Sequence, residues 1–242
     1  MPEVRAGDAL PDLIAAAAPE DLGAVDVLVV AHKVVSKAEG RTLRLADIEA
    51  GERARELADS DCARGKDPRL VQAILDDSAA ILRMGHGVLV CETHHGFICA
   101  NAGVDQSNTA DRDELIRLPA DPDRSARELR AGIGARRGVA PAVVVADSFG
   151  RAWRLGQVDV ALGVAGLQPL DDWRGRRDAR GRELAATVIA VADAVAAAAD
   201  LARAKDSNAP VVLVRGLERF VTAEDGPGAA ALRRPAGEDL FR

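Results

Sequence analysis

Three short, continuous apolar runs constrain the fold of this chain more than any other feature. They span residues 27–31, 143–146 and 211–214, and valine dominates each of them. A run of strand length without polar alternation predicts a strand that is buried on both faces. Polar side chains follow the first two runs at once, so we expect functional groups where those strands end.

Helices are expected between and after these strands. The helical patterns cover residues 10–18, 46–58, 68–85 and 183–204. Asp67 followed by Pro68 is a typical start for the third of these helices. Ser125 is the expected cap of a further helix, in which Leu129 and Ile133 form the buried face.

Hairpins complete the expected architecture. Residues 87–100 predict a β-hairpin with a glycine turn, and residues 151–166 predict a strand pair interrupted by glycines. The strand that begins at Val143 is expected to stop at Asp147. This irregular order predicts an α+β fold, in one domain over residues 1–242, instead of a regular βαβα series.

Composition argues against several classes of protein. Aromatic residues make up only 2% of the 242 residues and the formal net charge is -6, so base stacking and a basic nucleic-acid face are both disfavoured. The 3 cysteines are widely spaced, which is typical of reduced thiols in a cytoplasmic protein. Without a signal peptide or an apolar run of membrane-spanning length, we expect a soluble protein with no membrane segment.

Residues 101–108 are the strongest candidate for a functional site, because Asp105 and Asn108 stand there among small residues. Residues 147–151 show the same combination of polar and small residues, with Asp147 and Ser148 directly after an apolar strand. Two strand ends that carry carboxylate and hydroxyl oxygens predict a shared cation site. Solvated turns with Asx-type capping are the alternative, and spacing alone favours them.

Residues 32–41 are a candidate phosphate site, since His32, Lys33 and Lys37 stand there with a serine and a glycine. A capped turn explains the same residues. His94 and His95 suggest a metal site, but adjacent side chains in a turn diverge, which favours solvated turn residues. The chain has neither a GxxxxGK[ST] loop nor a dinucleotide fingerprint, so any nucleotide is held in another way.

Eight segments, taken in order along the chain, resemble one protein family. They are residues 2–8 (PEVRAGD), 32–41 (HKVVSKAEGR), 101–108 (NAGVDQSN), 118–123 (LPADPD), 147–154 (DSFGRAWR), 156–163 (GQVDVALG), 215–216 (RG) and 238–242 (EDLFR). Each segment alone is weakly specific. Together they resemble the coenzyme F(420):L-glutamate ligases, also called F(420)-0 gamma-glutamyl ligases or the CofE family.

The resemblance implies a GTP-dependent ligase that adds L-glutamate to the deazaflavin coenzyme F(420)-0 through an acyl phosphate and releases GDP and phosphate. It implies Mg²⁺ or Mn²⁺, as two ions, with K⁺ assisting. It also implies a CofE-like mixed, largely antiparallel sheet with covering helices and an interlocked homodimer. The flavin reductase domain that some relatives carry is not expected here.

The resemblance also assigns roles to residues, position by position. It makes Asp105 and Asp147 catalytic residues. The implied metal ligands are Asp105, Asp147 and Ser148. The implied GTP contacts are Met1, Pro2, Glu3, Val4, His32, Lys33, Lys37 and Asn108.

The sequence departs from the family pattern at several positions. His32 stands where a serine is common, and relatives usually have a strand ahead of Pro2. Residues 204–206 stand where many relatives have a Gly-Glu or Gly-Gln pair near the metals, so no ligand is assigned there. Two alternatives remain open: a GTP-dependent γ-glutamyl ligase acting on another carboxylate cofactor, and a non-catalytic nucleotide-binding relative.

Overall fold

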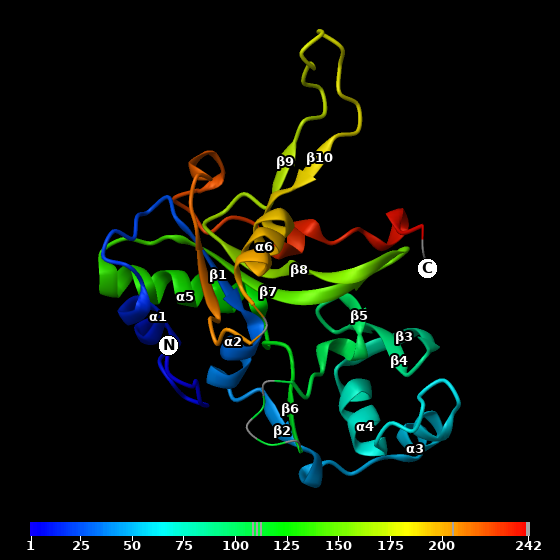
Figure 1. The fold of residues 1–242 in the computed structure, drawn as a ribbon. Helices are drawn as coiled ribbons and strands as arrows, with labels where there is room; N and C mark the ends of the chain where they lie inside the picture. The colour runs from blue at the N-terminus through cyan, green and yellow to red at the C-terminus, as the bar shows by residue number, and fades with distance from the viewer. Residues whose placement is uncertain (108, 110, 112, 205, 241–242) are drawn as a thin grey trace.

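A four-stranded sheet forms the centre of the computed structural model, which describes residues 1–107, 109, 111, 113–204 and 206–240 (Figure 1). In spatial order, its strands are β11 (Val211–Val214), β1 (Val27–Ala31), β7 (Ala142–Arg151) and β8 (Arg154–Ala165). β1 and β7 pair in parallel, and the other two pairings are antiparallel. The predicted α+β fold with a mixed, largely antiparallel sheet is therefore confirmed.

Helices cover both faces of the central sheet (Figure 1). α6 (Val191–Ala202) covers one face, and the other face carries α1 (Leu10–Ala17), α2 (His32–Ala38) and α5 (Pro122–Arg137). Successive side chains of a strand point to opposite faces, which decides the helix that each one meets. Val27 and Val29 pack with α6, whereas Leu28 and Val30 pack with α1 and α5.

A second group of elements lies at one end of this sheet, at the lower right of Figure 1. It contains α3 (Glu52–Asp59), α4 (Pro68–Asp76) and a three-stranded sheet of β3 (Ser78–Gly85), β4 (Val88–Thr93) and β5 (Ile98–Ala100). The pair of β2 (Thr42–Arg44) and β6 (Glu114–Ile116) lies beside this group, below α2 in Figure 1. Ile74 and Leu89 of the group and Leu115 of β6 belong to a separate apolar cluster, so the group and the β2–β6 pair share a core of their own.

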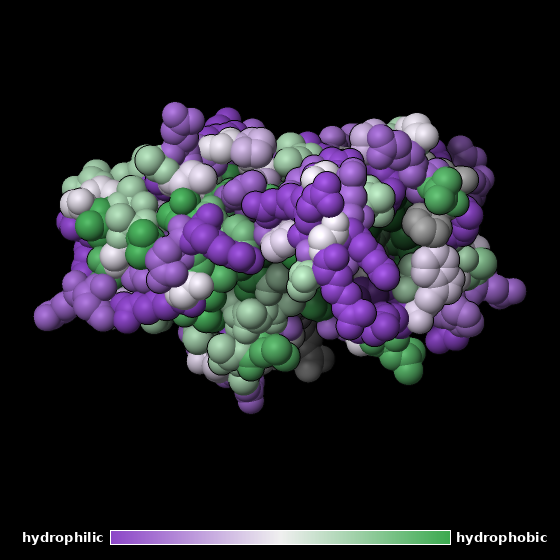
Figure 2. Space-filling model, turned by 90° about the horizontal axis from the view of Figure 1, so that it is seen from above, coloured by the Kyte–Doolittle hydropathy of each residue, from purple (hydrophilic) through white to green (hydrophobic). Residues whose placement is uncertain are grey.

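A two-stranded arm projects from the body of the molecule at the top of Figure 1. It consists of β9 (Leu170–Asp172), β10 (Val188–Ala190) and the chain between them. Figure 2, seen from the side of the arm, shows hydrophilic side chains mixed with exposed hydrophobic ones. Within the described ranges, no helix combines the length and apolarity needed to cross a membrane.

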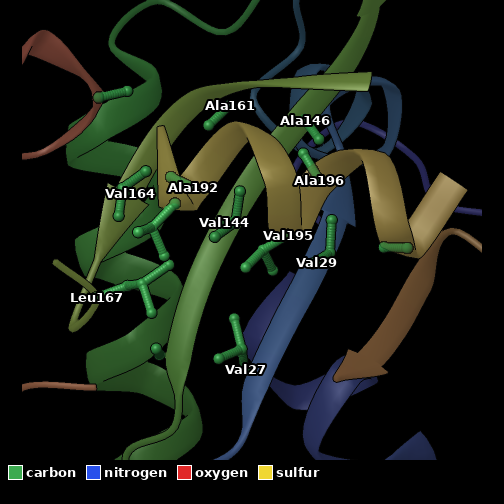
Figure 3. Close-up of a cluster of buried hydrophobic side chains, with 14 residues drawn as sticks. Val27, Val29, Val144, Ala146, Ala161, Val164, Leu167, Ala192, Val195 and Ala196 are labelled. Atoms are coloured by element: carbon green, nitrogen blue, oxygen red, sulfur yellow. The ribbon is translucent and has the colours of Figure 1, made fainter. Parts of the chain in front are cut away.

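Alanine and valine fill the core between α6 and the sheet. Figure 3 shows Ala192, Val195 and Ala196 of α6 lying over Val144 and Val29 of the sheet. With few aromatic residues available, close packing depends on these small side chains, which let the helix approach the strands. The buried strands predicted from the valine runs are confirmed for β1 and β7, where Val27, Val29 and Val144 are 0% exposed. The third run forms the edge strand β11, and its four residues are only half-buried.

The predicted helices were found at about the expected places in the chain, but several begin or end at other residues than predicted. The helix expected over 46–58 begins only at Glu52, and the one expected over 183–204 is α6, preceded by strand β10. Asp67 caps α4 as predicted, because its side chain accepts from the Arg69 amide, but that helix ends at Asp76 and β3 follows. The prediction of a helix through Gly85 was therefore wrong.

Three local predictions also need correction. Asp121, not Ser125, caps α5 by accepting from the Arg124 amide, and Ser125 lies inside the first turn. β7 does not stop at Asp147 but continues to Arg151, because β8 pairs with it along that length. Residues 154–165 form the single long strand β8, not a strand pair.

Candidate active site at the start of α2

The register of two parallel strands brings His32 and Asp147 together. Ala31 is the last residue of β1, and it pairs with Ala146 of β7. α2 begins directly at His32, so the residues predicted to form a turn are helical instead. The His32 Nε2 atom lies 3.3 Å from Asp147 Oδ1, and the His32 side chain is buried. This contact does not meet hydrogen-bond geometry, so Nε2 remains a buried polar atom without a hydrogen-bond partner.

Asp147 is an ionised carboxylate in a largely buried position. Burial raises the pKa of this carboxyl group, but the neighbouring His32, the Ser148 amide and the charge of Lys33 together bring the pKa below its usual value. The sequence predicted Asp147 at a strand end, whereas it lies within β7, beyond the last residue that pairs with β1. The carboxylate thus lies beside the start of α2.

Lys33 holds the second carboxylate. Its Nζ lies 2.7 Å from Asp105 Oδ2 and also contacts Ser107 Oγ. The Ser107 amide donates to Asp105 Oδ1 at 2.8 Å, and backbone hydrogen bonds of Asp105 with Ile116 fix the loop to β6. Burial raises the pKa of Asp105, but Lys33 and Ser107 outweigh it and leave the pKa below its usual value.

The first two residues of α2 therefore connect the two aspartates that the sequence singled out. His32 contacts Asp147, Lys33 contacts Asp105, and the charge of Lys33 also acts on Asp147. Asn108, the predicted nucleotide contact next to Asp105, lies outside the residues that the structure describes. Asp105 and Asp147 thus both lie at the start of α2, and the predicted role of Asn108 stays a prediction.

The N-terminal segment lies along α2 as well. Lys37 Nζ is 2.5 Å from Glu3 Oε1, and the Gly7 amide donates to the Ala38 carbonyl at 2.9 Å. Val4 packs in the core with α1 and α2, which anchors the segment. Met1, Pro2 and Glu3 are exposed. The segment predicted to contact a nucleotide is therefore adjacent to Lys37.

Ser148 faces the other side of the sheet. Along β7, Val145 packs toward α5 and Ala146 toward α6, and this alternation directs Asp147 to the α2 side and Ser148 to the α6 side. The Ser148 hydroxyl donates to Asp159 Oδ1 at 2.6 Å. Of the three predicted metal ligands, the structure thus places two beside α2 and the third on the opposite face.

Asp159 and Arg203 form a buried polar pair on the α6 face of the sheet, which the sequence reasoning missed. Asp159 is 4% exposed, and Arg203 donates to its Oδ2 at 2.9 Å. The only signal in the sequence was a carboxylate between Val158 and Val160, within an otherwise apolar strand segment. Its partner lies 44 residues away at the end of α6, so no local pattern could reveal the pair.

The chemistry of these donors fits a divalent cation of the magnesium type. Asp105 and Asp147 offer charged oxygen atoms only, and Mg²⁺ commonly takes one or two carboxylates and completes its shell with phosphate oxygens and water. Within the described ranges, no group of three or more His, Cys, Asp or Glu side chains forms a complete protein cage. The donor set therefore suits a metal shared with a phosphate ligand.

The two turn histidines do not form a metal site. The His94 Nε2 atom lies 3.2 Å from the Asp76 carbonyl oxygen, whereas the His95 Nε2 atom lies 3.1 Å from the Ala120 carbonyl oxygen. Their rings point to different segments of the chain, and His95 stacks on Phe97 with a centroid distance of 5.8 Å. They tie the β4–β5 turn to its neighbours.

Comparisons with known proteins agree with one another. The sequence model of the family described as F420-0:Gamma-glutamyl ligase matches residues 1–216. The coenzyme F420:L-glutamate ligase of Methanothermobacter thermautotrophicus is 44% identical over 246 residues, which cover 100% of this chain and 96% of that protein. The protein of the same name from Methanopyrus kandleri is 45% identical over 242 residues, covering 99% and 94%. The one from Halorubrum lacusprofundi is 46% identical over 222 residues, covering 90% and 85%.

Proposed function

The chain belongs to the F420-0:gamma-glutamyl ligase family, and from this premise we propose that it joins L-glutamate to the deazaflavin coenzyme F420-0 with GTP as co-substrate. The family identified from the eight sequence segments is confirmed, and it is a family of enzymes that form a C–N bond with glutamate. One structural observation carries the proposal: the start of α2 connects Asp105 and Asp147 through Lys33 and His32.

The proposed reaction has two steps. A carboxylate oxygen of the acceptor attacks the γ-phosphorus of GTP, the bond to the bridging oxygen breaks, and GDP leaves. The glutamate amine then attacks the carbonyl carbon of the acyl phosphate, loses a proton and expels inorganic phosphate, which forms the amide. Both steps bring anions together, so the site must supply positive charge.

Residues of this chain meet that demand in different ways. Asp105 and Asp147 would hold Mg²⁺ or Mn²⁺, two ions with K⁺ assisting, and a bound divalent cation neutralises charge on the phosphoryl group. Lys33 and Lys37, four residues apart on α2, would attract phosphate oxygens. Glu3 contacts Lys37, and the segment from Met1 to Glu3 would supply a wall for the nucleotide.

His32 has a more specific role in this proposal than a contact with GTP. Its side chain is buried, and the Nδ1 atom lies 3.4 Å from Ser36 Oγ while Nε2 faces Asp147. A buried ring that contacts Ser36 at Nδ1 and lies 3.3 Å from Asp147 Oδ1 at Nε2 would restrict the rotation of the Asp147 carboxylate. We therefore assign His32 to the positioning of Asp147, and leave the phosphate contacts to the lysines.

A homodimer is part of the proposal, and the exposed apolar surface near α6 supports it. A hollow of about 230 Å³ is lined by Ile189, Val191, Ala194, Val195, Ala198, Val214, Leu217, Arg219 and Phe220. Val188 and Ile189 on the arm are 39% and 43% exposed, and Leu201 of α6 is 91% exposed. A second copy that covers this surface would bury apolar area and support the projecting arm.

The decisive experiment follows the acceptor by mass spectrometry. The purified chain is incubated with GTP, Mn²⁺, L-glutamate and the deazaflavin acceptor, and the same assay is run with other carboxylate cofactors. A gain of a glutamyl unit on the deazaflavin, with GDP released, is the expected result. Transfer only to another cofactor would point to a ligase of different specificity, and GTP binding without any transfer would point to a non-catalytic protein.

A further inference from the structure

One nitrogen atom at the start of α2 is buried and unpaired. The His32 side chain is 2% exposed, and its Nε2 atom makes no hydrogen bond with the residues that the structure describes. Buried polar atoms are nearly always paired, and an unpaired one needs an explanation, such as a bound ion. Because an unpaired buried atom costs free energy, His32 Nε2 marks a place where a ligand would stabilise the folded chain.

The other ring nitrogen of His32 has a partner, which decides how the ring can act. Nδ1 lies 3.4 Å from the hydroxyl oxygen of Ser36, a fully buried residue one turn further along α2. A neutral imidazole has a hydrogen on one nitrogen and a lone pair on the other. With the hydrogen on Nδ1, the ring donates to Ser36 and directs the Nε2 lone pair toward Asp147. Histidines that bind metals are commonly fixed in this way, through a hydrogen bond from the second ring nitrogen.

His32 Nε2 and the Asp147 carboxylate have the spacing of two ligands on one ion. Nε2 lies 3.3 Å from Asp147 Oδ1, without the geometry of a hydrogen bond. Histidine nitrogens and carboxylate oxygens lie about 2.0–2.2 Å from a divalent metal, so two such donors at right angles are about 3 Å apart. The Asp147 side chain is 19% exposed, which leaves a path by which an ion can enter from solvent.

A nitrogen donor changes which metal the site prefers. Carboxylates and water suit Mg²⁺, whereas an imidazole nitrogen suits first-row transition metals, whose affinities also rise from Mn²⁺ toward Cu²⁺. In the part of the chain that the structure describes, no three His, Cys, Asp or Glu side chains gather into a closed metal site. One nitrogen and one carboxylate therefore leave the remaining positions to phosphate oxygens and water.

We propose that His32 Nε2 is a direct ligand of the divalent ion at Asp147 and makes this position selective for a first-row transition metal over Mg²⁺. The inference rests on the proposed function for the presence of a cation at Asp147, and it deepens that function by naming a further ligand and a class of metal. It also extends the role of His32. Without the ion the ring restricts Asp147, and with the ion bound both side chains hold the same metal.

The test detects a nitrogen ligand directly. The purified chain is loaded with Mn²⁺, with and without GDP, and electron spin echo envelope modulation records the nuclei next to the ion. We expect a ¹⁴N coupling in the wild type. Labelling the chain with ¹⁵N-histidine should replace it with a ¹⁵N coupling, which separates an imidazole from lysine, backbone and guanine nitrogens.

Variants assign the coupling to one of the 4 histidines of the chain. We expect the coupling to disappear in His32→Gln. A triple variant with glutamine at positions 86, 94 and 95 leaves His32 as the only histidine, and it should keep the coupling. Because the triple variant does not alter the buried ring, the assignment does not depend on whether His32→Gln folds.

Metal titrations test the selectivity. His32→Gln should weaken Mn²⁺ binding by more than about 10-fold, which is the smaller of the losses caused by removing an outer-shell partner, and should weaken Mg²⁺ binding less. His95→Gln is the matched control. His95 also has a buried ring nitrogen without a hydrogen-bond partner, but its Nε2 atom contacts the Ala120 carbonyl oxygen, and no described ion pair places a carboxylate beside the ring. This control should leave both affinities within about twofold of the wild type.

The outcomes separate the inference from the proposed reaction. A wild type that binds no Mn²⁺, Mn²⁺ without a histidine coupling, a coupling lost in the triple variant, or equal losses of Mn²⁺ and Mg²⁺ affinity in His32→Gln would each overturn the inference. A wild type that transfers glutamate but shows no histidine coupling refutes only the ligand role of His32. A wild type that shows the coupling but transfers no glutamate refutes only the proposed reaction.

Discussion

Replacing Asp105 with asparagine separates its role in the fold from its role in catalysis. Asparagine keeps the size of the side chain and an oxygen that can still accept the Ser107 amide, which lies 2.8 Å from Asp105 Oδ1. It removes the negative charge that Lys33 contacts at 2.7 Å and that a divalent cation would need. The variant therefore tests the charge while preserving the turn.

The expected effect on stability is small. The side chains of Lys33 and Asp105 are 21% and 42% exposed, so solvent screens the pair and its loss costs about 0.5–1 kcal/mol. For a chain of this size, 1 kcal/mol corresponds to a change in Tm of about 2–4 °C. We therefore expect Asp105→Asn to lower Tm by about 1–4 °C.

The expected effect on catalysis is much larger. Removing one preorganised group that stabilises transition-state charge typically lowers kcat about 100-fold to 1,000-fold, or about 3–4 kcal/mol. GDP release is measured with all three substrates and Mn²⁺, beside Asp113→Asn, an exposed aspartate on the same loop, as the control. Turnover within threefold of the wild type would refute the metal assignment. A drop in Tm of more than about 10 °C would show that the residue is mainly structural.

Three further predictions follow from packing and burial. A Cβ at position 163 would lie 2.0 Å from the Pro122 carbonyl oxygen, so Gly163→Ala should destabilise the chain by about 1–3 kcal/mol in urea unfolding, and an unchanged midpoint would refute the close approach. Burial, with the nearby Asp147 charge, raises the pKa of the Cys99 thiol to about 12, so iodoacetamide at pH 8 should modify the exposed Cys62 and spare Cys99 until the chain unfolds, as mass spectrometry of peptides will show. Burial raises the pKa of the Asp193 carboxyl group above its usual 3.8, so the folded state binds the carboxyl proton more tightly than the unfolded state does. The wild type therefore loses stability as the pH rises and this group ionises. The Tm of Asp193→Asn relative to the wild type should increase from pH 3.5 to pH 7.

The central strands could be predicted from the sequence because their environment is uniform. β1 and β11 are continuous apolar runs. Polar residues need not alternate with apolar ones in a strand whose two faces are both covered by helices, or in one as short as β11. β3 was misassigned because Ile81, Leu82 and Met84 continue the apolar pattern of α4 without a glycine or proline between them. Periodicity alone cannot separate a helix from a strand over so few residues.

The site was predictable as a set of residues but not as an arrangement. Asp105 and Asp147 were found because carboxylates follow or lie within apolar strand segments, which is a local signal. The contacts that define their surroundings are long-range: Lys33 is 74 residues from Ser107, and Asp159 is 44 residues from Arg203. Such pairs depend on how helices pack on the sheet, and that information is absent from any short window of sequence.

The separation of Asp147 and Ser148 onto two faces is a consequence of strand register. β1 leaves the sheet at Ala31, so β7 beyond Ala146 pairs only with β8, and one edge of β7 opens beside α2. A shift of one residue in the pairing of β7 would exchange the two faces. A shift in one direction would put Ser148 in the place of Asp147, facing His32. A shift in the other direction would put Asp147 opposite Asp159 on the α6 face, where two carboxylates repel each other. The register that buries the valines of β7 on both faces therefore also decides which oxygen faces Lys33 and which one faces Arg203.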